Sequence, residues 1–194
     1  MTSTLPVLHP TAPELQAARW FNIQGELSLA RLRGKVVALH AFQMLCPGCV
    51  AHGLPQAQRM HQLFGAAGLQ VIGLHTVFEH HQVMEQPEAL AAFLHEYRFT
   101  FPVAADQPHG RIPATMSALA LRGTPSVLLI DRQGRLRLHE FGRVDDMAIG
   151  AAIGGLLAEP LAEPLAAQVA EPHAWSSPEA RPGCSEEGCR FSRS

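Results

Sequence analysis

The succession of apolar runs constrains the fold of this chain more than any other feature of its sequence. Residues 35–44 (KVVALHAFQM) form a β-branched, apolar run of strand length, and residues 49–67 carry apolar side chains at the three- and four-residue spacing of a helix. Residues 69–77 (LQVIGLHTV) form a second run of strand length. Parallel strands need a crossover of about a dozen residues or more between them, so this order predicts a strand–helix–strand unit.

The remainder of the periodic body predicts an alternation of the same kind. The expected elements are a helix over 87–99, a strand over 101–105, a short helix over 112–121, strands over 126–130 and 135–141, and a last helix over 145–158. The last two strands are joined by the turn sequence DRQG and should pair antiparallel. The predicted fold class is therefore α/β, with a mixed central sheet flanked by helices on both faces.

The size of the chain supports one core. With 194 residues, of which 47% are hydrophobic, the chain can bury a single full core, so one domain over 1–158 is expected. Residues 159–194 are rich in Pro, Ala and Glu and lack a sustained apolar period, which predicts a mobile tail, with a short helix over 161–169 as an alternative.

Charge and hydropathy exclude several classes of partner. The formal net charge is -2 and no cluster of Lys and Arg is interleaved with aromatic residues, so nucleic acid is not expected as a partner. No stretch reaches the roughly 18 to 20 apolar residues that a membrane span needs, and the first twenty residues lack a basic start followed by an apolar run. We therefore expect a cytoplasmic protein with no membrane partner.

Two thiols, Cys46 and Cys49, lie where the first predicted strand leads into the first predicted helix. The free N–H groups and the dipole at a helix start stabilise a thiolate, which is the nucleophilic form of cysteine. Cys46 is thus the expected attacking thiol. Residues three apart at a helix start have Cα atoms about 5 to 6 Å apart, within the range of a disulfide, so Cys49 is expected to resolve the mixed disulfide.

Two other interpretations use the same cysteines. Both could be inert core residues, or they could form half of a zinc site that two histidines complete. The candidate ligands are His52, His75, His80 and His81. The spacing lacks a second regular ligand pair, and a cytosolic chain with four cysteines favours redox chemistry or metal over a disulfide scaffold. We expect no metal and no cofactor.

The sequence Gly123-Thr124-Pro125, just before residues 126–130 (SVLLI), resembles the cis-proline loop of the thioredoxin superfamily. The stretches RGKVVALHAF, FLHEYRFTFPVAAD and LALRGTPSVLLIDRQGRL resemble its TlpA-like/redoxin branch, which is related to AhpC/TSA, and the likeness spans about residues 18–158. The resemblance implies a thioredoxin fold with a central redoxin-type insertion, and a thiol-disulfide oxidoreductase. It also implies that Thr124 and Pro125 hold the substrate backbone beside the two thiols.

Two histidines are candidates for moving the proton of Cys49. His52 follows Cys49 by three residues, where relatives often carry Glu, and His40 stands six residues before Cys46, where thioredoxins place a buried carboxylate. An imidazole can accept a proton near neutral pH, so either could serve as a base during resolution. The alternative for both is a histidine that only satisfies local hydrogen bonds.

Departures from the family pattern limit what carries over. Leu45 stands where the family usually has an aromatic residue, and Gly48 stands where many relatives have Pro, so neither partner specificity nor the reduction potential is transferable. The peroxiredoxin pattern P-x-x-x-T-x-x-C is also missing before Cys46.

The expected function is reduction or exchange of disulfides in proteins or small molecules, with the thioredoxin or glutathione system supplying a thiol reductant. The alternatives are an antioxidant, thiol-dependent peroxidase and a non-enzymatic redox sensor whose dithiol switches partner binding. Cys184 and Cys189 form a C-x4-C pair between glycines, which we interpret as a candidate second dithiol that relays electrons to Cys46 and Cys49. An inert reduced tail is the other interpretation.

Overall fold

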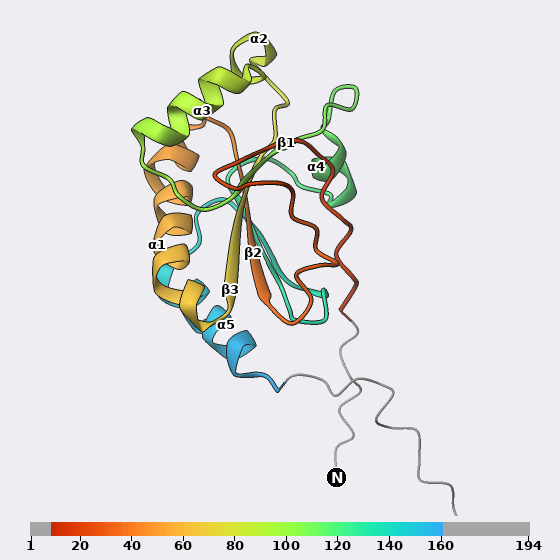
Figure 1. Cartoon of the computed structure of the whole chain (residues 1–194), viewed down its shortest axis with the longest axis vertical. Coiled ribbons are helices and arrows are strands. Elements are labelled where there is room, and N and C mark those ends of the chain that lie inside the picture. The colour runs from red at the N-terminus through yellow and green to blue at the C-terminus, as the bar shows by residue number, and fades with distance from the viewer. Residues whose placement is uncertain (1–8, 161–194) are drawn as a thin grey trace, which may run out of the picture. The chain divides into compact units, whose positions relative to one another are not determined.

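A six-stranded mixed sheet forms the centre of the protein. The computed structural model describes residues 9–160 (Figure 1). The strands are β1 (Ala17–Phe21), β2 (Val36–Phe42), β3 (Leu69–His75), β4 (Val103–Asp106), β5 (Ser126–Ile130) and β6 (Leu136–Phe141). They lie in the order β1-β4-β3-β2-β5-β6; β2, β3 and β4 run parallel, and the other neighbouring pairs are antiparallel. The predicted strand–helix–strand unit and the terminal hairpin are both present.

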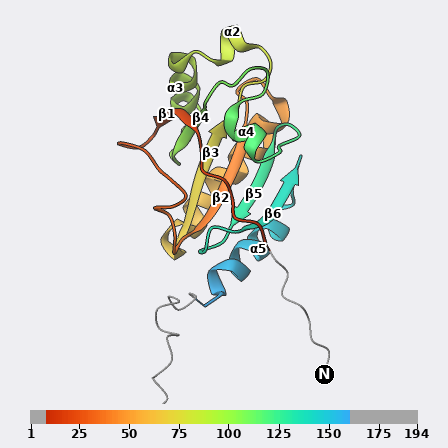
Figure 2. The ribbon, with the colours of Figure 1, turned by 90° about the vertical axis from the view of Figure 1, so that its right-hand side faces the viewer.

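Helices cover both faces of this sheet (Figures 1 and 2). The helical elements are the π-helical turn η1 (Cys49–Gly53), α1 (Leu54–Phe64), the 3-10 turn η2 (Gly65–Ala67), α2 (His81–Met84), α3 (Pro87–Glu96), α4 (Ala114–Ala118) and α5 (Asp146–Ala158). Side chains of α1, α3 and α5 share a hydrophobic cluster on one face of the sheet. The other face packs against α4 and the chain before β2. The predicted α/β class is confirmed.

The central strand β2 explains why its sequence reads as a continuous apolar run. All seven of its residues are buried. Val36, Ala38 and Phe42 enter the cluster with α1 and α5, whereas Val37 and Leu39 enter the cluster with α4. A strand that is covered on both faces needs apolar side chains at every position rather than at alternate ones.

Two elements were missed by the sequence analysis, and two helices are shorter than expected. β1 is a half-exposed strand that pairs only with β4 at the edge of the sheet, and α2 is a short helix between β3 and α3 that the predicted elements do not include. α3 stops before Arg98, and α4 stops before Ala120; both residues have positive φ, 56° and 51°. Such left-handed residues end a helix, and the apolar spacing does not reveal them.

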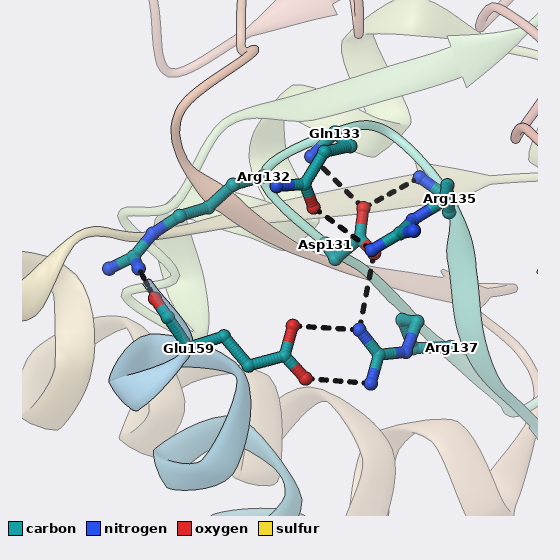
Figure 3. A network of polar contacts seen from close by, with 6 residues as sticks. All are labelled: Asp131, Arg132, Gln133, Arg135, Arg137 and Glu159. Carbon is teal, nitrogen blue, oxygen red and sulfur yellow. Dashed lines mark hydrogen bonds and ion pairs between the residues drawn. The ribbon is translucent and has the colours of Figure 1, made fainter. Parts of the chain in front are cut away.

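The turn between β5 and β6 is held by a network centred on Asp131 (Figure 3). The carboxylate of Asp131 accepts hydrogen bonds from the backbone N–H groups of Gln133 and Arg135, and pairs with Arg135 Nε at 2.8 Å and Arg137 Nη1 at 3.2 Å. Burial opposes the charge, but the hydrogen bonds from Arg135 and Arg137 outweigh it and hold the pKa of Asp131 below its usual range. This turn is therefore pinned by charge-assisted hydrogen bonds.

The same network extends to the end of α5. Arg137 forms a two-pronged pair with the carboxylate of Glu159, at 2.7 and 2.8 Å, and Arg132 donates to the carbonyls of Leu157 and Glu159. Contacts of the domain thus reach one residue past the predicted boundary at 158. The predicted helix over 161–169 and the pair Cys184 and Cys189 lie outside the described residues.

Candidate active site

Cys46 and Cys49 lie at the carboxyl end of β2, where helical backbone begins at Pro47. Cys46 is half-buried, and Cys49 is fully buried; neither forms a disulfide. The backbone N–H of Cys49 donates to Cys46 Sγ over 3.2 Å. Pro47 loses nothing in this first turn, because its missing N–H would have no intrahelical partner there. A first-turn N–H therefore points at the reachable sulfur, as the sequence predicts for the attacking thiol.

The loop that carries Thr124 and Pro125 closes over the two thiols. Cys46 Sγ lies 3.6 Å from the carbonyl oxygen of Thr124, and the Thr124–Pro125 peptide bond is cis, as predicted. A Cβ on Gly48 would lie 3.4 Å from Pro125 Cδ, so the glycine lets the helix start and the proline ring approach closely. Two segments that are distant in sequence thus form one site around Cys46.

The environment of Cys49 keeps its thiol protonated. Burial, followed by the hydrogen bond with Cys46, raises the pKa of Cys49 to about 12. A thiol with that pKa is not ionised at neutral pH. Any reaction in which Cys49 acts as a nucleophile therefore needs a group that takes its proton.

His40 lies beneath the π-helical turn that contains Cys49. Its side chain is only 2% exposed, and neither ring nitrogen has a hydrogen-bond partner among residues 9–160. Burial lowers the pKa of His40 to about 4, so the imidazole is neutral at neutral pH. A Cβ on Gly53 would lie 2.8 Å from His40 Cε1 and 3.1 Å from Pro125 Cβ. Gly53 thus lets the helix settle on both residues, a role that the sequence analysis missed.

His52 lies three residues after Cys49, a spacing that would place the two on one face of an α-helix, but the structure does not place them so. The backbone N–H of Leu54 donates to the carbonyl of Cys49, five residues back, so this turn is wider than an α-helical one. As a result Cys49 is buried while His52 is exposed. His52 and His40 instead line one cavity of about 280 Å³ beside Pro125.

The outer wall of this cavity is polar and internally bonded. Gln56 donates to the carbonyl of Val144 at 2.9 Å and to Asp146 Oδ1 at 2.7 Å, and Arg59 pairs with Asp146 Oδ2 at 2.8 Å. These contacts join α1 to the start of α5. They fix one side of the space into which His40 and His52 face.

The zinc interpretation finds no support in the arrangement of the described residues. Within 9–160, no group of three or more His, Cys, Asp or Glu side chains is placed to hold a metal ion. His75 is buried in β3, and His81 pairs with Glu85 at 2.9 Å in α2. His80 is exposed at the start of α2.

No helix of the described part is long and apolar enough to cross a bilayer.

Comparison with known proteins assigns the family. The profile of the AhpC/TSA family matches residues 9–139. The chain belongs to the AhpC/TSA family. A solved thioredoxin-like superfamily protein is 56% identical, with 78% of this chain and 99% of that one covered and a TM-score of 0.76. A thiol-disulfide isomerase from Corynebacterium glutamicum is 53% identical, with 77% and 98% covered and a TM-score of 0.72.

A third solved structure is more distant. It is described as a thiol:disulfide interchange protein DsbE from Chlorobium tepidum, and it is 25% identical, with 77% of this chain and 96% of that one covered and a TM-score of 0.62. No curated protein matches the chain. Together these relatives confirm that the chain has a thioredoxin-like fold of the redoxin branch. They also confirm that it is a thioredoxin-like oxidoreductase, which implies disulfide-containing substrates.

Proposed function

We propose that Cys46 and Cys49 are the redox centre, and that the protein reduces or exchanges disulfides in proteins or small molecules. The observation that carries this proposal is the surroundings of Cys46 Sγ. It is reachable from solvent, receives the N–H of Cys49 at 3.2 Å and lies 3.6 Å from the Thr124 carbonyl. The proposed nucleophile, Cys46 Sγ, therefore contacts both the N–H group that would stabilise its thiolate and the loop that would position the substrate.

The reaction proceeds in two exchanges. The Cys46 thiolate attacks one sulfur of the substrate disulfide, the S–S bond breaks, and the other substrate sulfur leaves as a thiolate that takes up a proton. Cys49 then attacks Cys46 Sγ, which releases the second substrate thiol and leaves a Cys46–Cys49 disulfide. The substrate gains two electrons and two protons. A thiol reductant, of the thioredoxin or glutathione system, returns the pair to the dithiol.

The loop at Thr124 and Pro125 positions the substrate in this scheme. The carbonyl of Thr124 already faces Cys46 Sγ, so an extended substrate segment placed along this loop would bring its disulfide to the attacking sulfur. Pro125 packs on Gly48 and Gly53, which keeps the loop against the helix that carries both thiols.

The second exchange needs an acceptor for the proton of Cys49, and His40 and His52, which line the cavity beside Pro125, are the two candidates. The raised pKa of Cys49 prevents spontaneous ionisation. His40 is neutral and its ring nitrogens have no partner among residues 9–160, but its lowered pKa makes it a weak base, so it would pass the proton on rather than keep it. His40 also contacts Gly53 in the turn that contains Cys49. His52 opens to solvent in the same cavity and would serve as the next acceptor or as the alternative base.

Mass-resolved alkylation and trapping test the assignment. With iodoacetamide, Cys46 should react at least tenfold faster than Cys49, because Cys49 is buried and protonated. Cys49→Ser should accumulate a mixed disulfide at Cys46 with a disulfide-bonded peptide, and Cys46→Ser should form none. Faster labelling of Cys49, or a mixed disulfide at Cys49 in wild type, would contradict the assigned order of attack.

Activity assays on the same wild-type protein distinguish the two alternative functions, a thiol-dependent peroxidase and a redox sensor. A thiol-dependent peroxidase would consume hydrogen peroxide faster than it reduces disulfides, and a redox sensor would show slow turnover with every model disulfide. The reduction potential against glutathione then decides the direction of electron flow. A cytoplasmic location, the TlpA-like assignment and the tail dithiol stay predictions from the sequence.

A further inference from the structure

A second cavity, of about 110 Å³, lies at the edge of the sheet formed by β1 and β4. We call it the His75 pocket. Its walls come from β1, from the end of β3 and the residues after it, and from α2 and α3; they are mostly apolar and include Phe21, Val77, Met84 and Leu90. Neither Cys46 nor Cys49 contributes to it. The pocket therefore requires an explanation separate from the dithiol.

One polar group among these apolar walls lacks a partner. His75 is only 3% exposed, and its Nε2 has no hydrogen-bond partner within the described part of the chain. Its ring packs against Phe42, with centroids 5.2 Å apart, which restrains its orientation. A buried nitrogen without a partner is unfavourable, so a group that supplies the missing hydrogen bond would be held preferentially at this site.

The charged side chains around the pocket are already engaged. Both carboxylate oxygens of Asp106 accept backbone N–H groups, from Thr115 at 2.8 Å and Met116 at 2.9 Å. Glu85 pairs with His81, and the guanidinium of Arg19 lies over the ring of Phe21, 5.5 Å from its centroid. Burial lowers the pKa of His75 to about 4, so its imidazole is uncharged at neutral pH. The pocket thus favours an uncharged ligand.

We propose that the His75 pocket binds a small, uncharged phenol, with its ring between Phe21, Met84 and Leu90 and its hydroxyl on Nε2 of His75, which a small shift of the pocket wall must uncover because this nitrogen is buried. A hydroxyl both donates and accepts, so it suits either tautomer of the imidazole. The thioether of Met84 and the ring of Phe21 favour an aromatic body over an aliphatic one. An apolar cavity of about 150 Å³ takes up benzene. The His75 pocket is smaller, about 110 Å³, but it is partly open, so one ring is the largest body that it suits.

Binding of phenol, toluene and benzoate to the full-length protein at pH 7.5 tests the proposal. Titrations followed by nitrogen-15 NMR of the histidine side chains would report both the affinity and the group that is contacted. Phenol should bind roughly fivefold more tightly than toluene, which lacks the hydroxyl, and benzoate should bind more weakly than either. Phenol should shift the Nε2 resonance of His75, whereas toluene should leave it nearly unchanged.

Variants distinguish the contribution of the His75 hydrogen bond to ligand binding from that of the apolar walls of the pocket. His75→Phe should abolish the preference for phenol over toluene, whereas His139→Phe, on the exposed part of β6, should preserve it. Ala18→Phe, at an exposed position on the wall, should obstruct the pocket and weaken binding of both probes without touching the core. Equal affinity for phenol and toluene in wild type, no saturable binding, or a phenol effect that persists in Ala18→Phe would overturn the proposal.

Discussion

His40, in β2, and Asp131, in the turn after β5, are buried to nearly the same depth, at 2% and 3% exposure, but their surroundings differ. Asp131 accepts hydrogen bonds from two backbone N–H groups and from two arginines (Figure 3), whereas neither nitrogen of His40 has a partner among residues 9–160. A satisfied buried group adds stability, and an unsatisfied one costs it. The hydrogen bonds of Asp131 thus stabilise the turn after β5, whereas the unpartnered His40 destabilises the end of the sheet that carries the thiols.

The two residues also have lowered pKa values for opposite reasons. Arginine partners favour the charged form of Asp131 over the opposing effect of burial, whereas burial disfavours the charged form of His40. At neutral pH the domain therefore contains a buried carboxylate that is charged and a buried imidazole that is not. Acid should affect the two regions in different pH ranges.

The largest expected effect is on the pH dependence of stability. Unfolded histidines take up a proton near pH 6.5, but His40 and His75 stay neutral in the native state down to about pH 4. The unfolded chain then binds more protons, so the free energy of unfolding should fall as pH decreases from 6.5 to 4, by roughly 3 kcal/mol for each residue. Urea denaturation at half-unit pH steps measures it.

Two variants assign this slope to its source. His40→Leu should remove about half of the loss between pH 6.5 and 4. Asp131→Asn should leave the pH dependence of the free energy of unfolding unchanged between pH 6.5 and 4. It should reduce that dependence only below about pH 4, where the carboxyl group of Asp131 takes up a proton in the unfolded chain before it does so in the native protein. A wild-type stability that is constant from pH 6.5 to 4 would contradict the buried, neutral state of both histidines.

The next effect is the loss of stability in Asp131→Asn at pH 7. The change removes the charge that Arg135 and Arg137 face, and we expect the free energy of unfolding to fall by about 2 kcal/mol, with disulfide reduction at native conditions unchanged. Glu140→Gln, on the exposed end of β6, is the matched control and should change it by less than about 0.5 kcal/mol. Equal losses in the two variants would mean that the network contributes nothing.

A smaller effect is expected at the thiol end from Gly53→Ala. The added methyl group would meet His40 and Pro125 at 2.8 and 3.1 Å, so the helix must shift, at a cost of about 1 to 2 kcal/mol, and the resolution step should slow. Gly65→Ala is the control, because nothing lies within 4 Å of its Cβ and the change should stabilise by about 0.5 kcal/mol. Stability curves and stopped-flow turnover measure both. If Gly53→Ala changed neither the free energy of unfolding nor the rate of resolution, the helix would not be packed closely on His40 and Pro125.

The smallest expected change in stability separates the two regions most sharply. His40→Leu replaces an unpartnered polar side chain with an apolar one, so at pH 7 stability should be unchanged or rise by up to about 1 kcal/mol. Resolution of the mixed disulfide should nevertheless slow, while attack by Cys46 is unaffected. His52→Gln is the companion variant. If His52→Gln slows resolution and His40→Leu does not, the base is His52.

Local patterns in the sequence were sufficient for much of the fold. The apolar run at β2, the turn after β5 and the last helix, α5, lie in short stretches, where periodicity and turn chemistry depend on neighbours in the chain. The sequence also indicates the dithiol, from its spacing at a helix start, and the Thr124–Pro125 loop, from family resemblance.

Tertiary structure decided the rest. β1 became a strand only because β4 offers an open edge, and the wide turn at Cys49–Gly53 moved His52 out of the face that its spacing predicted. Whether a buried polar side chain is satisfied depends on residues far away in the sequence, as with Glu159 for Arg137. The sequence by itself determined the central strands, the main helices and the position of the two thiols, because those follow from local chemistry, but it did not determine β1 or α2. The partners of His40 and Asp131 follow from packing, which no local pattern encodes.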